Sequence, residues 1–243
     1  MRFLWWVNSL WRVPLILLVT AVLASISVLF SVFDASGRLQ HRCAKAWADF
    51  IFWVSRVKLK VEGVDKIDPE KGYVFTANHL SMFDHWAFLS GLPIQFRFVA
   101  KESLFKLPFL GWHLKRAGNI PVSATRYRRT VRAFQDASKH IARGISYVIY
   151  PEGGRTWGRM LPFKKGSFLL PVHAKAPIVP VTIIDAHKRL ARGSALLIPG
   201  TMKMIIHDPL HPPEYQGLDL QTLADRVQAT VASAYPESTH GQS

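Results

Sequence analysis

The residues best suited to chemistry lie in the segment Asn78-His79-Leu80-Ser81-Met82-Phe83-Asp84. A histidine can take a proton from a hydroxyl near neutral pH, and a nearby carboxylate orients the imidazole and stabilises its protonated form. On a regular helix, His79 and Asp84 would lie about 140° apart around the axis. For the two side chains to meet, the segment must therefore be a loop that turns into a helix near Ser81 or Asp84, both of which favour helix N-termini. A structural histidine beside a helix-capping aspartate would show the same spacing.

A second candidate site is the turn Pro151-Glu152-Gly153-Gly154-Arg155-Thr156. Its two glycines permit close approach to the backbone, and the guanidinium of Arg155 offers a fork of donors that fits phosphate or carboxylate. A tight turn with a surface arginine is the alternative interpretation.

Each candidate site follows a run of residues typical of a buried strand, 73–77 before His79 and 146–150 before Glu152. Open α/β sheets bind ligands at the carboxyl ends of their strands, so the two segments are expected at one end of a sheet. Further strands are predicted over 57–62, 96–100, 119–122, 178–184 and 202–206, and helices over 86–89, 125–143, 166–174 and 220–231. Pro108 should kink or divide any helix over 101–116. The alternation predicts an α/β fold with a mainly parallel central sheet flanked by helices.

Two apolar segments precede this domain. Residues 13–33 carry no charge and, as a helix of about 31 Å, are long enough to span a bilayer or to lie in its interface. Over 35–56 an apolar stripe recurs at helical spacing, opposite a basic side; the stripe consists of Leu39, Cys43, Trp47, Phe50 and Val54, and the basic side of Arg38, His41, Arg42 and Lys45. Such a helix lies in a headgroup layer or packs on its own domain. The predicted organisation is a membrane-associated helical pair over 1–56, an α/β domain over 57–235 and a polar tail over 236–243.

Composition limits the partners. The 31 Lys and Arg exceed the 16 Asp and Glu by 15, so an anionic partner is expected: phospholipid, a nucleotide-bearing carrier or nucleic acid. Nine of the basic residues lie between Arg97 and Arg132, against Glu102 alone, and the eight Trp and fifteen Phe favour a membrane surface. No nucleic-acid motif is recognisable, and His85 and His113 lack partners at metal-ligand spacing. Cys43, the single cysteine, excludes an intrachain disulfide and suits a reducing compartment.

Four short motifs follow one another between about residues 74 and 184. They are Asn78-His79-x-Ser81-x-x-Asp84; Lys101-x-x-Leu104-x-x-x-Pro108-x-x-Gly111 with Gly118-Asn119-Ile120 after it; Tyr150-Pro151-Glu152-Gly153-Gly154-Arg155-Thr156 continued by Leu161-Pro162-Phe163-Lys164-Lys165-Gly166; and Pro177-Ile178-Val179-Pro180-Val181. Each is weak alone. In this order they resemble the 1-acylglycerol-3-phosphate acyltransferases, within the wider family of glycerolipid acyltransferases.

The resemblance implies an enzyme that moves a fatty acyl group from acyl-CoA or acyl carrier protein to the sn-2 hydroxyl of lysophosphatidic acid, giving phosphatidic acid for phospholipid synthesis. His79 would be the general base and Asp84 its orienting group. Arg155, with Lys101 assisting, would bind the phosphate of the acceptor, in a pocket shaped by Glu152 and Gly153. Supporting positions would be Asn78, Ser81, Gly154, Thr156, Lys164 and Arg126. No metal or cofactor is expected.

Three departures from the family pattern bear on the acceptor. The family usually has Thr where Gly154 stands and Ser where Thr156 stands, and it has an arginine near Ala124, for which the nearest candidate here is Arg126. A different lysolipid acceptor is therefore an alternative, and a non-catalytic module that binds anionic membranes is a second one. In the enzyme interpretation, the catalytic domain is expected at the cytoplasmic face of a membrane, the inner membrane in a bacterium.

Overall fold

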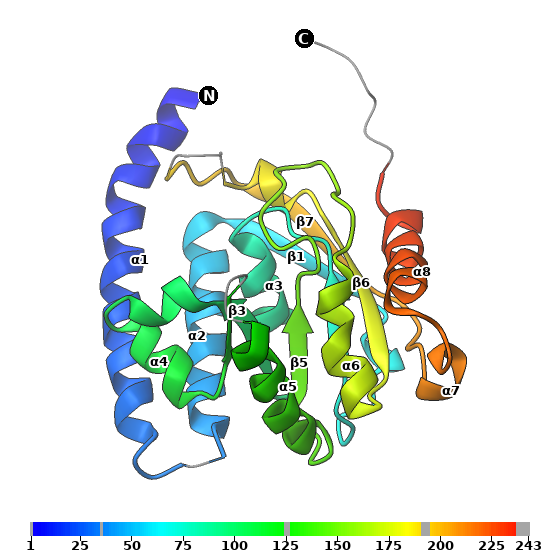
Figure 1. The fold of residues 1–243 in the computed structure, drawn as a ribbon. Coiled ribbons are helices and arrows are strands. Elements are labelled where there is room, and N and C mark those ends of the chain that lie inside the picture. The colour runs from blue at the N-terminus through cyan, green and yellow to red at the C-terminus, as the bar shows by residue number, and fades with distance from the viewer. Residues whose placement is uncertain (1, 35, 124–126, 191–194, 237–243) are drawn as a thin grey trace.

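A sheet of seven strands forms the centre of the molecule (Figure 1), within the residues that the computed structural model describes: 2–34, 36–123, 127–190 and 195–236. The strands are β1 (Val57–Glu62), β2 (Val74–Ala77), β3 (Phe96–Lys101), β4 (Ile120–Val122), β5 (Ser146–Ile149), β6 (Ile178–Ile184) and β7 (Gly200–Ile206). Their order across the sheet is β1-β7-β6-β2-β5-β3-β4, and every neighbouring pair is parallel except β6 with β7. The predicted α/β fold with a mainly parallel sheet is confirmed.

The position of each strand explains its sequence pattern. The central strands β2 and β5 are buried at every residue, and their sequences are continuous apolar runs, as strands covered on both faces require. Strand β1 lies at the edge and alternates buried or half-buried with exposed residues. Thr76 of β2 pairs with Ile149 of β5, so these two neighbouring strands end side by side.

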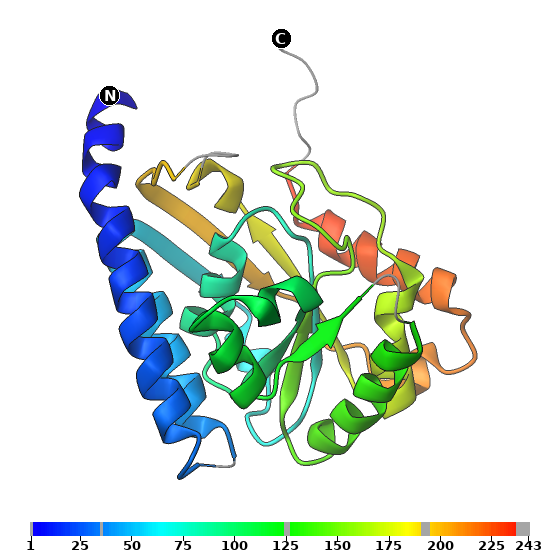
Figure 2. The same ribbon diagram turned by 60° about the vertical axis from the view of Figure 1, so that its left-hand side comes forward.

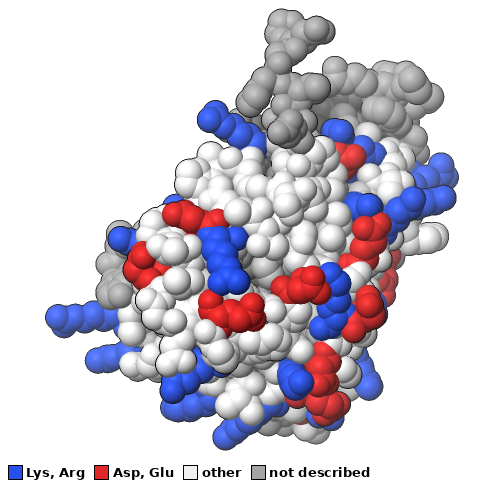
Figure 3. Space-filling view, turned by 90° about the vertical axis from the view of Figure 1, so that its right-hand side faces the viewer, with Lys and Arg blue, Asp and Glu red and all other residues white. Residues whose placement is uncertain are grey.

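Helices cover both faces of the sheet. On one face lie α2 (Arg38–Ser55) and α3 (Phe83–Gly91), and on the other lie α5 (Tyr127–Ile141), α6 (Leu169–Ala174) and α8 (Leu220–Ser233). Helix α4 (Leu110–Arg116) lies beside α1, and α7 (Pro212–Tyr215) precedes α8. The side of the molecule that carries α7 and α8 mixes acidic and basic side chains (Figure 3).

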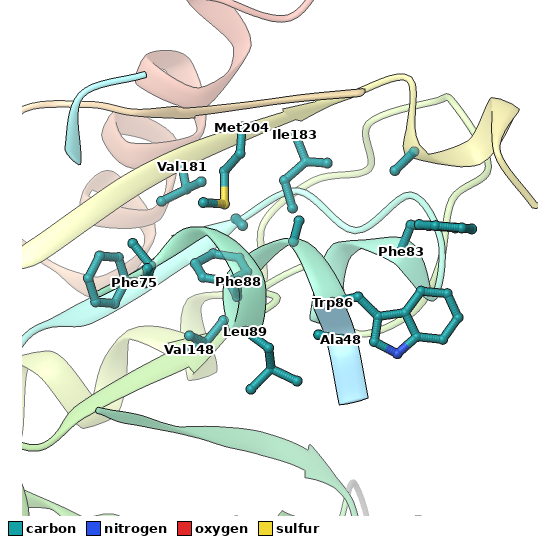
Figure 4. Close-up of a cluster of buried hydrophobic side chains, with 14 of the residues drawn as sticks. Ala48, Phe75, Phe83, Trp86, Phe88, Leu89, Val148, Val181, Ile183 and Met204 are labelled. Atoms are coloured by element: carbon teal, nitrogen blue, oxygen red, sulfur yellow. The ribbon is translucent and has the colours of Figure 1, made fainter. Parts of the chain in front are cut away.

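The largest core cluster lies between the sheet and the helices α2 and α3 (Figure 4). Phe75 of β2 and Phe88 of α3 are fully buried and meet edge to face at 6.1 Å. Phe83, at the first position of α3, packs on Phe52 of α2 and on Trp86. These contacts fix α3, and with it Asp84, against the end of β2.

Helix α1 (Arg2–Phe30) lies alongside α2 on the outside of the molecule (Figure 2). Three of its polar residues, Ser9, Thr20 and Ser27, face the rest of the protein. Trp47 Nε1 donates to Thr20 Oγ1 at 2.8 Å, Ser27 Oγ lies 2.6 Å from His113 Nδ1, and the amide of Leu197 donates to Ser9 Oγ at 3.1 Å. Its outward face is apolar and exposed; it consists of Leu10, Trp11, Leu17, Leu18, Val22, Ile26, Leu29 and Phe30. The stretch Ser9–Phe30 is long and apolar enough to cross a membrane by length and composition.

The structure corrects the predicted faces of α2. Its most deeply buried apolar residues are Ala48 and Ile51, whereas Leu39, Cys43, Trp47 and Phe50 of the predicted stripe are half-buried. The reason is that α2 packs on α3 along one side and on α1 along another, so its covered surface is wider than a single stripe. His41, predicted on the basic side, is packed edge-on against Phe96 at 4.8 Å.

Two other predictions concern segment ends. As predicted, the chain divides at Pro108, because the 3₁₀ turn η2 (Glu102–Lys106) ends before it and α4 begins after it. Of the predicted tail 236–243, all but Pro236 lies outside the described residues.

Candidate active site

His79 and Asp84 face one another at the carboxyl end of β2. His79 lies on the loop two residues after β2, and Asp84 is the second residue of α3. The imidazole Nδ1 lies 2.7 Å from Asp84 Oδ2, and the Asp84 side chain is fully buried. This is the geometry that the five-residue spacing demanded. Because a carboxylate oxygen only accepts, Nδ1 carries the proton, and Nε2 is left with the lone pair that a general base needs.

The loop holds the Asp84 carboxylate with its own backbone. Asp84 Oδ2 accepts the amides of Leu80 at 2.6 Å and Ser81 at 2.9 Å in addition to the imidazole. Ser81 Oγ accepts the amide of Phe83 at 3.0 Å and donates to the carbonyl of Ala186 at 3.1 Å, which starts α3 and ties it to the loop after β6. The predicted turn from loop to helix is therefore built by Ser81, and Asp84 lies in the first turn, where a negative charge is favoured.

The backbone of His79 is held from the neighbouring strand. Glu152 Oε1 accepts the His79 amide at 2.6 Å, and Thr156 donates to the His79 carbonyl from its amide at 2.8 Å and from its Oγ1 at 3.0 Å. Glu152 and Thr156 belong to the turn after β5, which is the strand beside β2. The second candidate segment thus fixes the position of the first.

Glu152 joins two segments of backbone at the site. Its second oxygen, Oε2, accepts the amide of Leu161 at 2.7 Å, so both oxygens already hold backbone N–H groups of the protein. Burial raises the pKa of Glu152 to about 7, an effect that the amides of Leu161 and His79 partly offset. A buried carboxyl group with both oxygens engaged positions His79, and its part in shaping a phosphate pocket stays a prediction.

Asn78 also fixes the position of the His79 loop. Its Nδ2 donates to the carbonyl of Ile183 at 2.9 Å, and its Oδ1 accepts the amide of Ile183 at 2.7 Å. These two bonds continue the pairing of β2 with β6 beyond the last residue of β2, and they place the His79 loop at a fixed distance from the sheet.

Two aromatic side chains that the sequence interpretation left without a role enclose the imidazole of His79. The ring of Tyr150 stacks on it at 4.2 Å with 19° between the planes, and the ring of His85 meets it edge to face at 5.1 Å. Desolvation, with the nearby charges of His79 and Arg155, lowers the pKa of His85 to about 3, so His85 is neutral at physiological pH. Burial raises the pKa of Tyr150 well above its ordinary value. Their sequence signal was adjacency alone, since Tyr150 precedes the second segment and His85 follows Asp84.

Cationic side chains lie around the turn after β5. The guanidinium of Arg155 is exposed and lies over the ring of Trp157, 5.3 Å from its centroid, close enough to His85 to act on its pKa. Lys164 packs against the backbone of Gly153, where a Cβ would come within 2.5 Å of Lys164 Nζ. Lys101 is exposed at the last position of β3, at the same end of the sheet. Arg126 lies outside the described residues.

Gly154 stands in open space. No heavy atom of the described residues lies within 4 Å of the place a Cβ would take, and the φ of Gly154 is outside the left-handed region. A larger side chain therefore fits there, so Gly154 leaves room beside Arg155.

An apolar cavity of about 150 Å³ reaches His85, whose ring contacts that of His79. Its walls come from α1, α2, α3 and α4, through residues such as Leu23, Trp47, Trp86 and Leu114. Ring contacts along one side lead from His79 through His85, Phe98 and Phe96 to His41, in steps of 5.1, 5.2, 5.3 and 4.8 Å. The cavity therefore lies between the sheet and the helices, with the ring of His85 between it and His79, and a hydrocarbon chain can be buried there.

The end of the cavity away from His79 carries two buried histidines. Burial lowers the pKa of His41 and of His113 to about 4, so both are neutral in the folded protein. Ser27 of α1 contacts His113 there, which closes the cavity between α1 and α4.

Known proteins resemble this chain in sequence. The chain is 30% identical over 200 residues to the chloroplastic 1-acyl-sn-glycerol-3-phosphate acyltransferase of Arabidopsis thaliana, covering 81% of this chain and 54% of that protein. It is 26% identical over 189 residues to the human 1-acyl-sn-glycerol-3-phosphate acyltransferase alpha, covering 76% of this chain and 67% of that protein. The chain spans 54%, 56% and 62% of the length of three plant and algal relatives, from Arabidopsis thaliana, Brassica napus and Chlamydomonas reinhardtii.

The fold is also known from a crystal structure. The 1-acyl-sn-glycerophosphate acyltransferase of Thermotoga maritima superposes with a TM-score of 0.76 over the full length of both chains, at 23% sequence identity. At that identity the likeness concerns the fold, including helices that precede the sheet. The family model described as Acyltransferase matches residues 58–184, more than half of the sequence and both segments that build the His79 site. The chain belongs to the Acyltransferase family.

Proposed function

We propose that the protein transfers a fatty acyl group from an acyl thioester to the sn-2 hydroxyl of lysophosphatidic acid, giving phosphatidic acid. The observation that carries the proposal is the His79–Asp84 pair at 2.7 Å; His85, which contacts His79, lines an apolar cavity, and cationic side chains lie at the same end of the sheet. The names of the relatives, which are 1-acyl-sn-glycerol-3-phosphate acyltransferases, support the choice of acceptor.

The reaction follows from the geometry. His79 Nε2 takes the proton of the acceptor hydroxyl as its oxygen attacks the thioester carbonyl, and Asp84 stabilises the imidazolium that forms. The tetrahedral intermediate then collapses, the C–S bond breaks, and the imidazolium returns its proton to the leaving thiolate. The ester forms, a thiol is released, and His79 is restored without a metal or cofactor.

Binding energy comes from the two ends of the substrates. We assign the acyl chain of the thioester to the cavity and the phosphate of the acceptor to Arg155, with Lys101 and Lys164 as further cations at the same end of the sheet. A phosphate held there fixes the acceptor hydroxyl beside His79, which converts the attack into a reaction between positioned groups. The thioester carrier is acyl-CoA or acyl carrier protein.

The exposed apolar face of α1 supports a place on a membrane, where a lysolipid acceptor resides. Because the polar residues of α1 bond to the domain, we propose that α1 lies along the membrane with its apolar face in the lipid and the domain on the cytoplasmic side.

The proposal is tested with His79→Ala in the full chain and His173→Ala, an exposed histidine of α6, as the matched control. Lysophosphatidic acid and a panel of acyl thioesters are supplied on vesicles, and phosphatidic acid is measured. We expect the loss of a general base to lower the rate by about 10²–10⁴-fold, whereas the control keeps the rate of the unchanged protein. Undiminished turnover by His79→Ala would refute the assigned base.

Gly154 supports a second candidate acceptor. The open space at this position can take a lysolipid headgroup other than phosphate, such as an aminolipid. A panel of lysolipids separates the two acceptors: acylation of another lysolipid without acylation of lysophosphatidic acid would replace the first assignment by the second. Vesicle binding with no turnover on any acceptor, in the unchanged protein, would instead indicate a membrane-binding module.

A further inference from the structure

Four large apolar side chains are exposed within nine residues of the segment 104–112. The exposed fractions are 36% for Leu104, 45% for Leu107, 39% for Phe109 and 51% for Trp112. The segment begins in η2 and ends in α4. Scattered apolar residues are ordinary on a protein surface, but a contiguous group marks a surface that contacts a partner.

The backbone of this segment is strained at Phe109, beside the exposed apolar side chains. Phe109 has φ 58° and ψ −65°, and the amide of Leu110 donates to the carbonyl of Pro108 at 2.6 Å. This three-residue turn is rare and costs free energy for a residue with a Cβ. The Phe109 ring then lies 5.2 Å from that of Trp112. Gly111 makes the fold possible, because a Cβ there would lie 2.5 Å from the carbonyl oxygen of Phe105.

Basic side chains surround the apolar group. Lys101, Lys106, Lys115 and Arg116 are exposed in the same stretch of chain. Its acidic residue, Glu102, is paired with Arg129 at 2.8 Å. Amphipathic aromatics next to lysine and arginine match the interface of a membrane that contains anionic lipids, where each basic side chain contributes about 1 kcal/mol of attraction.

The segment also joins two features described above. Leu104 and Leu110 line the apolar cavity, so the exposed group forms part of its rim. Through the contact of His113 with Ser27, α4 is attached to α1, whose outward face is apolar and exposed. The rim of the cavity and α1 therefore present neighbouring apolar surfaces.

We propose that residues 104–112 are a second membrane contact, which inserts Phe109 and Trp112 into the interface of an anionic leaflet and holds the rim of the cavity against the lipid. The proposal deepens the function proposed above and rests on it for the occupant of the cavity. The membrane contact itself is measured without turnover. Continuity with α1 and the surrounding positive charge favour lipid as the partner.

The test compares two double variants of the full chain. Phe109→Ser with Trp112→Ser removes the rings, and Val172→Ser with Leu218→Ser removes two apolar side chains of similar exposure, 39% and 38%, elsewhere on the surface. Partition onto vesicles of phosphatidylglycerol and phosphatidylcholine is measured by sedimentation. Burying one large apolar side chain contributes about 1.5–3 kcal/mol, so we expect the first pair to weaken partition at least about tenfold and the control pair less than about twofold. Equal partition of the two pairs would overturn the proposal.

Further measurements separate loss of the contact from misfolding. Trp112→Ser alone, on the exposed side of α4, leaves the strained turn at Phe109 unchanged and should give part of the loss with an unaltered melting temperature. Lys106→Gln with Lys115→Gln should weaken partition onto phosphatidylglycerol vesicles and leave partition onto pure phosphatidylcholine unchanged. Equal weakening on both vesicles would refute the electrostatic part.

Failure of the membrane contact can be distinguished from failure of the proposed acyl transfer. On a water-soluble, short-chain lysophosphatidic acid, the ring variants should turn over as the unchanged protein does, because neither ring lines the cavity. If the ring variants partition more weakly but the unchanged protein acylates no acceptor, the membrane contact is upheld and the enzyme assignment is refuted. If the ring variants partition normally and the unchanged protein acylates lysophosphatidic acid, the membrane contact is refuted and the enzyme assignment is upheld.

Discussion

His79 is held by contacts from three directions. Asp84 fixes the ring, Glu152 and Thr156 fix the backbone, and Tyr150 covers one ring face. A general base must keep its lone pair aimed at the reacting hydroxyl, so each of these contacts contributes to the rate through position. The residues to vary are therefore those that touch His79 without touching substrate.

Tyr150 offers a clean comparison between ring and hydroxyl. The stacked ring stabilises a positive charge on His79, whereas its buried hydroxyl has no hydrogen-bond partner within the described residues. We expect Tyr150→Leu to lower the rate about fivefold, since the imidazolium that forms in the reaction loses a stabilising face, worth roughly 1 kcal/mol. Tyr150→Phe, which keeps the ring, should restore the rate. A Phe variant as impaired as the Leu variant would show that the hydroxyl matters instead.

The raised pKa of Glu152 predicts that the stability of the protein depends on pH. Its pKa in the folded protein is about 7, above the ordinary value of 4.5, so between these pH values the folded state binds more protons than the unfolded state. The free energy of unfolding should therefore fall as pH rises from 4.5 through about 7. Glu152→Gln removes this slope, and it lowers stability by about 1–3 kcal/mol because an amide has one acceptor oxygen for two backbone N–H groups. Urea unfolding of both proteins across this range measures the slope, and equal slopes would contradict the assignment.

At the residue scale, spacing gave the condition for His79 and Asp84 to meet, a loop that turns into a helix, and the ordered set of motifs favoured the pair. The role of Glu152 in holding the backbone of His79 could not be predicted. Its partner, the amide of His79, lies 73 residues away, and no periodicity relates the two positions. The resemblance named the residue, whereas its role as a positioning group depends on β2 and β5 being neighbours.

The two N-terminal helices differ in what they support. Helix α2 places Ala48 and Ile51 in the core with no exposure, whereas α1 contacts the domain through a few polar bonds and a few apolar side chains such as Ile16, and exposes its apolar outward face. Helix α2 is thus part of the domain, and α1 is attached to it.

Two deletions express this difference. Without residues 1–33 the protein should fold and partition weakly onto vesicles, and turnover of long-chain thioesters should fall more than that of short-chain ones, because Leu23 and Ala24 of the cavity wall are lost. Without residues 1–54 the core loses α2, and we expect no cooperative thermal transition. Circular dichroism with vesicle sedimentation checks both proteins. A cooperative transition in the shorter one would show that α2 is dispensable.

At the element scale, the strands were predictable because the central ones are continuous apolar runs and the edge strand alternates. The buried faces of α2 were harder to predict than the strands. Periodicity finds one stripe, and it cannot show that a second helix will cover the neighbouring stripe.

Across the whole molecule, the positive charge is unevenly placed. The side that carries α7 and α8 mixes acidic and basic side chains (Figure 3). Between Arg97 and Arg132, in contrast, all charged residues except Glu102 are basic. Within that stretch, Arg97 is buried and bonds to His140 at 3.2 Å, so it serves the fold. Among the described residues, the exposed cations of this stretch belong to β3, η2, α4 and α5. Charge along the sequence predicted an anionic partner, but burial decides which cations can meet it.

The site and the cavity share α3 but are otherwise built by different parts of the chain. The groups that hold His79 come from the loops after β2 and β5 and from Asp84 at the start of α3, whereas much of the cavity wall comes from α1, α2 and α4. Substitutions that reshape the wall in α1, α2 and α4 therefore leave the proton-transfer geometry in place. Under the proposed function, single mutations in these helices can change which acyl chains the protein accepts while the reaction itself stays the same. An organism that adapts its lipids to a new temperature can therefore do so without altering the catalytic residues.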